Sequence, residues 1–340
     1  MSSNTMHAIQ IEQDDARSLT WQKTSRPTPK EDQVLVKIHA AALNRADLLQ
    51  RKGLYPPPKG ASEIMGLEAA GEIVSCGEAV ENWSEGDRVC VLLEGGGYAE
   101  YVACDASMLL PIPKGFSWQQ AAALPEVFYT AFLNLKMEGD LKDGERVLVH
   151  AGASGVGTAV IQLCKAWGNP VIATTSTQKV TRLQELGATQ VFDRHTPDFF
   201  KAIREFTEGI EDGSEGRNRR GVDLIFDPVG ASYLEENISL LRLKGRLVLI
   251  GLLGGAQANI HLGKMLARRL KLIGSVLRSR SREEKLRITK RIKEEVWPLF
   301  EEGVLQPIIH STFPMKDAEA AHKLMASNQT IGKIILEVSH

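Results

Sequence analysis

Three glycines lie within six residues, directly after a run of β-branched residues and directly before a helical pattern. The stretch reads VLVHAGASGVGTAVIQL from residue 147, and the glycines are Gly152, Gly155 and Gly157. At a strand-to-helix turn, glycines let the backbone approach a ligand, and the helix N-terminus offers N–H groups to a pyrophosphate. The spacing follows G-x-G-x-x-G except that Ser154 replaces the middle glycine. We therefore predict a dinucleotide site whose pyrophosphate contacts are Gly152, Ser154, Gly155, Val156 and Gly157.

The second chemical landmark is the end of the next strand, where an NAD-specific site usually carries an acid about 20 residues after the glycines. There the chain reads TTSTQK, residues 174–179, which contains no acid. An acid would accept a hydrogen bond from the ribose 2′-hydroxyl but would repel a 2′-phosphate. The hydroxyls, the amide and the ammonium of this segment suit the phosphate instead. The cofactor is therefore predicted to be NADPH, held at its phosphate by Thr177, Gln178 and Lys179.

The elements that would position these residues alternate between apolar strands and helices from about residue 126 onward. Helical periodicity, as in 158–167 and 179–186, fills most gaps between the strand candidates at 146–150, 171–175, 190–193, 222–226, 246–251 and 270–276. Continuous apolar strands that alternate with helices indicate a parallel sheet covered on both faces.

The remainder of the chain has a different pattern of secondary-structure signals. The first 125 residues alternate short β-like runs with Gly/Pro turns such as YPPPKG and LPIPKG, which is typical of a β-rich domain. A charged helix is expected over Arg282–Glu302, and the closing IGKIILEV is expected to be a strand that returns to the first domain. Residues 208–220 carry acidic and basic side chains among several glycines, so we interpret them as a solvated loop.

Composition excludes several classes of function. The formal net charge of −1 over 340 residues gives no field that would attract nucleic acid or an anionic membrane. The longest apolar run is about half of the roughly 18 residues that a membrane span needs. The N-terminus lacks a basic start and an apolar signal core, so we expect a cytoplasmic protein. The four cysteines and eight histidines show no metal-ligand spacing, so no metal site is expected.

With those motifs placed, the chain resembles the zinc-free quinone oxidoreductase branch of the medium-chain dehydrogenase/reductase superfamily, most closely the tumour-suppressor-inducible NADPH quinone oxidoreductase type. The resemblance covers nearly the whole chain through blocks that recur in order: AALNRADLLQRKGLYPPPKGAS, GLEAAGEIVSCG, GDRVCVLLEGGGYAEYV, AAALPEVFYTAF, VLVHAGASGVGTAVIQL, IGLLGG and IGKIILEV. It implies an α/β protein with a GroES-like β-rich catalytic domain over 1–126, completed by 278–340. A Rossmann domain with a doubly wound parallel sheet would span 127–277, and NADPH would lie in the cleft between the domains.

The resemblance also implies that the protein works without zinc. Zinc-dependent relatives carry a cysteine ligand where this chain has Asn44 and a histidine ligand where it has Leu67, and the lobe with four cysteines is missing. Oxidation of an alcohol needs a Lewis acid to hold an alkoxide. A quinone or an enone already delocalises the charge that a hydride delivers, so positioning and hydrogen bonds can suffice.

The site residues implied by the resemblance fall into two groups. The catalytic group near the nicotinamide is Asn44, Asp47 and Tyr55, of which Tyr55 either stacks on the substrate and donates a proton or only packs its loop. Arg194 faces either the 2′-phosphate or solvent, and Thr130 either contacts the cofactor or starts a helix. The further cofactor contacts implied are Gly251, Leu252, Leu253, Leu277, Gly332 and Lys333.

The leading hypothesis is an NADPH-dependent oxidoreductase that transfers reducing equivalents to quinones. Within the enzyme class, an enone, 2-alkenal or enoyl thioester reductase is the alternative. From another class, the alternative is a non-catalytic NADPH-binding sensor or an RNA-binding protein, to which balanced charge and 6% aromatic residues lend little support. The expected partners are a small-molecule substrate and a second copy of the chain. The expected homodimer is implied by the resemblance and by the exposed edge that an open sheet leaves at residues 270–276.

Overall fold

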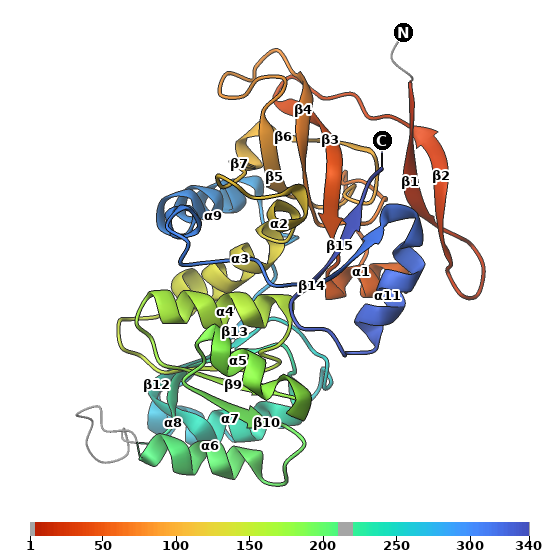
Figure 1. The fold of residues 1–340 in the computed structure, drawn as a ribbon. Helices are drawn as coiled ribbons and strands as arrows, with labels where there is room; N and C mark the ends of the chain where they lie inside the picture. The colour runs from red at the N-terminus through yellow and green to blue at the C-terminus, as the bar shows by residue number, and fades with distance from the viewer. Residues whose placement is uncertain (1–3, 210–219, 340) are drawn as a thin grey trace. The chain divides into compact units, whose positions relative to one another are not determined.

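The computed structural model describes residues 4–209 and 220–339. The chain divides into two compact units, both drawn in Figure 1. Unit 1 combines Met1–Tyr129 with Leu277–His340, and unit 2 is Thr130–Val276. Leu277, which the sequence assigns to the dinucleotide-binding domain, belongs to unit 1. Most of the predicted loop at 208–220, namely residues 210–219, lies outside the described residues.

Unit 2 is built on a six-stranded parallel sheet with the strand order β10-β9-β8-β11-β12-β13. The strands are β8 (Val147–Val149), β9 (Val171–Thr175), β10 (Gln190–Asp193), β11 (Val222–Asp227), β12 (Leu241–Leu249) and β13 (Lys271–Gly274). The chain runs outward from β8 to β10 and returns to β11 on the other side of β8. Ligands of such sheets bind outside the carboxyl ends of the strands at this reversal. The predicted doubly wound parallel sheet is confirmed.

The helices of unit 2 cover the two faces of this sheet, as Figure 1 shows. On one face, α6, α7 and α8 pack Ile203, Ile238 and Met265 against strand residues such as Ile225 and Leu247. The other face carries α4 and α5. The bounds are α4 (Gly155–Ala166), a 3₁₀ turn η3 (Thr177–Lys179), α5 (Val180–Leu186), α6 (Phe199–Glu208), α7 (Leu234–Leu240) and α8 (Leu262–Arg268). A π-helical segment, η2 (Leu133–Glu138), precedes β8.

Two strand boundaries in unit 2 differ from the sequence prediction. The strand predicted at 246–251 begins earlier, at Leu241, because Leu241 pairs with Val222 and β12 then passes a register shift before Arg246. Charged side chains and Gly245 interrupt the apolar pattern in this early part of β12, so hydrophobic periodicity does not predict it as a strand. The strand predicted at 270–276 is confined to Lys271–Gly274 and forms one edge of the sheet.

Unit 1 contains a seven-stranded sheet with the order β14-β15-β3-β4-β5-β7, in which β6 pairs with β3. A separate antiparallel pair, β1 with β2, packs residues such as Ile9 and Leu19 into the same core as Val36 and Val89. The strands are β1 (Thr5–Ile11), β2 (Leu19–Ser25), β3 (Gln33–Ala42), β4 (Glu68–Cys76), β5 (Arg88–Leu92), β6 (Tyr101–Asp105), β7 (Leu109–Pro111), β14 (Ile309–Pro314) and β15 (Lys333–Glu337). The predicted combination of a β-rich domain and a domain with a parallel α/β sheet is confirmed.

The helices of unit 1 are α1 (Arg45–Arg51), α2 (Trp118–Ala122), α3 (Pro125–Phe132, which ends in unit 2), α9 (Arg282–Glu295), α10 (Trp297–Glu301) and α11 (Ala318–Ala326). The single charged helix predicted over Arg282–Glu302 is therefore wrong. It is two helices, because Pro298 lies in the first turn of α10 and has no N–H to continue α9.

The C-terminal strand positions part of the candidate site. β15 pairs antiparallel with β3, and the N–H of Leu43 donates to the carbonyl of Ile334 at 2.9 Å. This pairing places Lys333 beside the residue that follows Leu43, which is Asn44.

Candidate functional site

The glycine turn of unit 2 connects β8 to the twelve-residue helix α4. A Cβ at Gly157 would lie 2.6 Å from the carbonyl oxygens of Ala151 and Gly152, and one at Gly152 would lie 2.8 Å from the Leu183 side chain. Backbone oxygens leave no room for a Cβ at Gly157, whereas at Gly152 the Leu183 side chain would have to shift. The hydroxyl of Ser154 accepts a hydrogen bond from the N–H of Gly157 at 3.0 Å and caps the helix.

This turn fits a pyrophosphate. Ser154 is exposed, and Gly155 and Val156 are half-buried in the first turn of α4. First-turn N–H groups have no partner inside a helix, and they carry the positive end of its dipole. The turn also lies at the carboxyl end of β8, where the strand order reverses. Gly152, Ser154, Gly155, Val156 and Gly157 are therefore brought together as one cradle.

The predicted phosphate-binding segment follows β9 as η3, with Thr177 and Gln178 exposed and Lys179 half-buried. The hydroxyl of Thr177 donates to the carboxylate of Asp193, the last residue of β10. Arg194 follows, exposed, and its backbone N–H donates to the carbonyl of Thr175 at 2.8 Å. The structure thus brings Thr177 and Arg194 to neighbouring strand ends and adds an acid that the sequence reasoning missed.

The predicted nicotinamide-side residues follow β12. The N–H of Leu253 donates to the carbonyl of Pro228 at 3.2 Å, which ties this segment to the turn after β11. Leu252 and Leu253 are 55% and 59% exposed, and a Cβ at Gly251 would lie 2.9 Å from the Pro228 oxygen. Thr130 lies inside α3, so it is not a helix-start residue.

A series of buried, hydrogen-bonded side chains, not predicted from the sequence, begins at His150, two residues before Gly152. One nitrogen of His150 lies 2.9 Å from the Thr174 hydroxyl, and the other lies 2.8 Å from Oδ1 of Asn237. Nδ2 of Asn237 donates to Asp227 at 3.0 Å. Burial lowers the pKa of His150, so the ring is neutral at pH 7. These hydrogen-bonded side chains fix the carboxyl ends of β8, β9 and β11 relative to one another. The one signal of them in the sequence is the polar His150 directly after an apolar strand.

The predicted catalytic residue Asn44 lies in a buried cluster of unit 1 with Glu68 and Lys333. The ammonium of Lys333 donates to the Leu43 carbonyl at 2.6 Å and to Oδ1 of Asn44 at 2.7 Å, and it lies 2.7 Å from Oε1 of Glu68. Nδ2 of Asn44 donates to the same Glu68 oxygen at 2.9 Å. Three acceptors match the three N–H bonds of the ammonium. Lys333, predicted as a cofactor contact, thus has its charge paired inside this cluster.

Asp47 joins the cluster through α1. Its Oδ2 accepts from the backbone N–H of Asn44 at 2.7 Å and from the hydroxyl of Tyr98 at 3.0 Å. Its Oδ1 is buried without a hydrogen-bond partner among the described residues. Burial raises the pKa of Asp47 to about 6, against the opposing hydrogen bonds from Asn44 and Tyr98. Asp47 is therefore held in place, and at pH 7 about one-tenth of the protein still carries its proton.

Glu126 is the most strongly perturbed acid that the sequence reasoning missed. It is the second residue of α3, and its backbone N–H donates to Oε2 of Glu68 at 2.9 Å. Burial, reinforced by the charge of Glu68, raises the pKa of Glu126 to about 8. Glu126 is one of the residues that line a unit 1 cavity of about 470 Å³, together with Glu94, Leu277, Arg278 and Lys285. A carboxyl group there can hold a proton at neutral pH and release it to a bound molecule.

Tyr55 lies next to this cavity through Arg278. The guanidinium carbon of Arg278 is 5.2 Å from the centre of the Tyr55 ring, and Nη1 donates to the Tyr55 carbonyl at 3.3 Å. Burial raises the pKa of Tyr55, and the charge of Glu126 adds to that rise. The predicted residue is thus held in place by an arginine that the sequence did not single out.

The last two predicted cofactor contacts, Gly332 and Leu277, both belong to unit 1. Gly332 has a φ of +78°, and a Cβ there would lie 2.1 Å from the Ile308 carbonyl oxygen, so glycine is required at this turn. Leu277 is buried in the wall of the 470 Å³ cavity.

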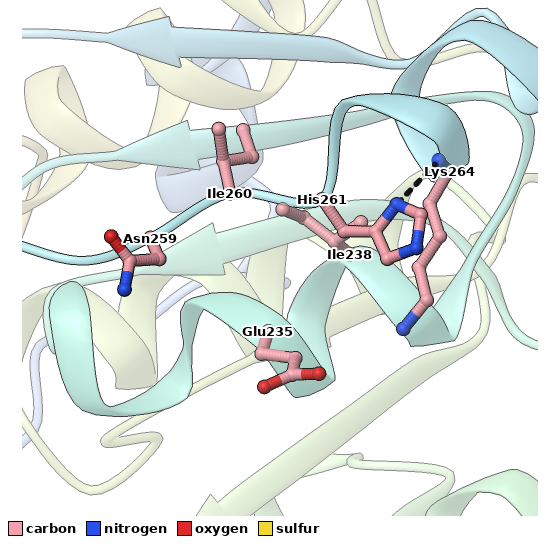
Figure 2. A pocket seen from close by; sticks show the side chains of 6 residues that line it. All are labelled: Glu235, Ile238, Asn259, Ile260, His261 and Lys264. Atoms are coloured by element: carbon pink, nitrogen blue, oxygen red, sulfur yellow. Dashed lines mark hydrogen bonds between the residues drawn. The ribbon is translucent and has the colours of Figure 1, made fainter.

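A second pocket, of about 290 Å³, lies in unit 2 between α7 and the start of α8. Figure 2 shows its lining, and the backbone N–H of Lys264 donates to Nδ1 of His261 at 3.3 Å. Nζ of Lys264 donates to Ser239 at 2.9 Å. None of the sequence-predicted site residues lines this pocket. Within residues 4–209 and 220–339, no helix has the length and hydropathy needed to cross a membrane.

Comparison with known proteins gives the family context of this geometry. Residues 30–114 match the alcohol dehydrogenase GroES-like domain, and residues 155–293 match the zinc-binding dehydrogenase family. A quinone oxidoreductase of Mus musculus is 30% identical over 313 residues, which cover 91% of this chain and 90% of that protein. The synaptic vesicle membrane protein VAT-1 homolog of Homo sapiens is 30% identical over 337 residues, covering 95% and 83%. The crystal structure of CurK enoyl reductase superposes with a TM-score of 0.84 at 27% identity, covering 99% and 100%.

Proposed function

Because this chain belongs to the quinone oxidoreductase branch of the medium-chain dehydrogenase/reductase superfamily, we propose that it is a metal-independent NADPH:quinone oxidoreductase. Enzymes of this superfamily are oxidoreductases that use a nicotinamide cofactor. What we propose beyond this family assignment is that the cofactor is NADPH, that the substrate is a quinone and that no metal is required. The observation that carries it is the buried ammonium of Lys333 between Asn44 and Glu68.

That ammonium argues for chemistry without zinc. Asn44 stands where zinc-dependent relatives have a cysteine ligand, and its oxygen already accepts from Lys333. Leu67 stands where they have a histidine, and it is a buried aliphatic side chain. The positive charge that balances the Glu68 carboxylate is the ammonium of Lys333, a side chain of the protein and not a bound metal ion. A Lewis acid is then missing for alcohol oxidation, whereas a quinone or an enone needs none.

The residues of unit 2 fit the cofactor. The cradle from Gly152 to Gly157 would hold the pyrophosphate, and Thr177, Gln178, Lys179 and Arg194 would surround the adenosine ribose and its phosphate. The segment Gly251–Leu253 would offer backbone groups to the carboxamide. When bound, the cofactor supplies the hydride.

Glu126 is our proposed source of the proton. A quinone that gains a hydride becomes a hydroquinone anion, and one proton completes the neutral hydroquinone. Glu126 holds a proton at neutral pH and lines the cavity with Arg278, whose positive charge favours developing anionic oxygen. The Glu126 proton goes to the substrate oxygen, and solvent returns a proton to the carboxylate. Tyr55 is the alternative donor.

A second candidate, an enoyl or enone reductase, is favoured by the structural likeness to CurK enoyl reductase. The same hydride and the same Glu126 proton would saturate a carbon–carbon double bond beside a carbonyl group. The test is a substrate panel of 1,2-naphthoquinone, a 2-alkenal and an enoyl thioester, with absorbance followed at the reduced-nicotinamide band. The proposal predicts the highest kcat/KM for the quinone. A preference for either enone would establish the second candidate, and cofactor binding without turnover of any substrate would support the sensor.

A further inference from the structure

A carboxylate touches the segment that the sequence assigns to the 2′-phosphate of NADPH. Asp193 ends β10, and in the parallel register it lies opposite Thr175, the last residue of β9. Its Oδ2 accepts from the Thr177 hydroxyl, and its Oδ1 accepts from the N–H of His195 at 2.9 Å. Counting along the chain from the glycines cannot find this acid, because the neighbouring strand supplies it.

The charge of Asp193 is present under working conditions. The hydrogen bonds from Thr177 and His195 lower the pKa of Asp193, so the carboxylate is ionised at neutral pH. Arg194 lies next in sequence, and its positive charge lies close enough to the Tyr233 hydroxyl to oppose the rise in the pKa of Tyr233 that burial causes. The phosphate-binding segment therefore combines the cations of Lys179 and Arg194 with one anion.

We propose that Asp193 is a specificity-determining residue that weakens the preference for NADPH and gives the protein usable affinity for NADH. A carboxylate at this place accepts a hydrogen bond from a free ribose 2′-hydroxyl and repels a 2′-phosphate. It also holds the Thr177 hydroxyl, which would otherwise donate to that phosphate. This inference rests on the proposed dinucleotide site, and it limits the NADPH preference that TTSTQK alone predicts.

The test measures binding, so it needs no substrate. Dissociation constants of NADPH and NADH are measured by the fluorescence of the reduced nicotinamide for the wild type, Asp193→Asn and Glu205→Gln. Glu205 is a matched control: it is an exposed acid on α6 of the same unit, 3.8 Å from Lys201. A surface charge interaction with a phosphate that carries nearly two charges predicts an NADPH Kd about three- to tenfold lower in Asp193→Asn. The NADH Kd should stay the same or rise.

Two further measurements separate charge from hydrogen bonding. The gain in NADPH affinity should shrink as ionic strength increases, because the repulsion is screened. Thr177→Val removes the donor and keeps the carboxylate charge, so it should not reproduce the gain. An NADH-to-NADPH Kd ratio that changes no more in Asp193→Asn than in Glu205→Gln would overturn the inference and leave the proposed function standing. Failure of the wild type to bind either nucleotide would overturn both.

Discussion

Replacing Glu126 with glutamine removes one ionisable proton from the cavity and keeps nearly the same shape. The pKa of Glu126 is raised to about 8, so about nine-tenths of the protein carries this proton at pH 7 and about one-tenth at pH 9. If Glu126 protonates the substrate, kcat/KM of the wild type falls about tenfold per pH unit above 8. Loss of a general acid typically costs about 10²–10⁴-fold in rate. Glu126→Gln should therefore lower kcat by that order and lose the alkaline limb of the profile, with the NADPH Kd unchanged.

The assay is quinone-dependent NADPH oxidation between pH 6 and 10, with binding followed separately by fluorescence. Glu63→Gln is the control, because Glu63 is an exposed acid of unit 1 that lies outside the cavity lining. Tyr55→Phe tests the competing donor. The pKa of Tyr55 is raised from an ordinary value of about 10, so Tyr55 cannot produce a limb near pH 8. A Glu126→Gln protein with the wild-type rate and an unchanged alkaline limb would refute the reasoning and move the proton to Tyr55 or to solvent.

The remaining predictions concern stability and assembly. Lys333→Met should destabilise the protein by about 3–5 kcal/mol, because it leaves the fully buried Glu68 carboxylate without its cation; urea unfolding checks this, and adding Glu68→Gln should recover part of the loss. The pKa values of Asp47 and Glu126 are raised to about 6 and about 8, so the native state binds more protons than the unfolded chain, and stability should fall as pH rises from about 4 to 8. Glu126→Gln should accordingly raise the melting temperature at pH 8.5 and leave it unchanged at pH 4.5; an equal effect at both pH values would contradict the assigned pKa. Pairing of the exposed edge strand Lys271–Gly274 between two copies predicts a solution mass near twice 37.4 kDa, and a monomer by light scattering at working concentration would exclude that pairing.

Features that depend on residues close together in the sequence could be predicted from it. The strands β8, β9, β10 and β11 lie within a residue or two of their predicted positions, because continuous apolar runs and glycine punctuation are local signals. The glycine turn at Gly152–Gly157 could be predicted for the same reason, because consecutive residues form the turn and lead into α4.

The rest depends on pairing between distant segments. Lys333 and Asn44 are 289 positions apart, and only the antiparallel pairing of β15 with β3 brings them together. Asp193 approaches Thr177 through the register of two parallel strands, which a count along one strand cannot reveal. The raised pKa of Glu126 arises from burial beside Glu68, 58 positions away, so the residue reads in the sequence as an ordinary acid in the first turn of a helix.

The central claim is quinone reduction by NADPH in which Lys333, not a metal, supplies the buried positive charge. The most direct measurement is kcat/KM for 1,2-naphthoquinone with NADPH in protein dialysed against a strong chelator, together with the metal content of the same sample by elemental analysis. The account predicts less than about one-tenth of a metal ion per chain and undiminished turnover. Stoichiometric zinc before dialysis, with turnover lost on its removal and regained on its return, would contradict it.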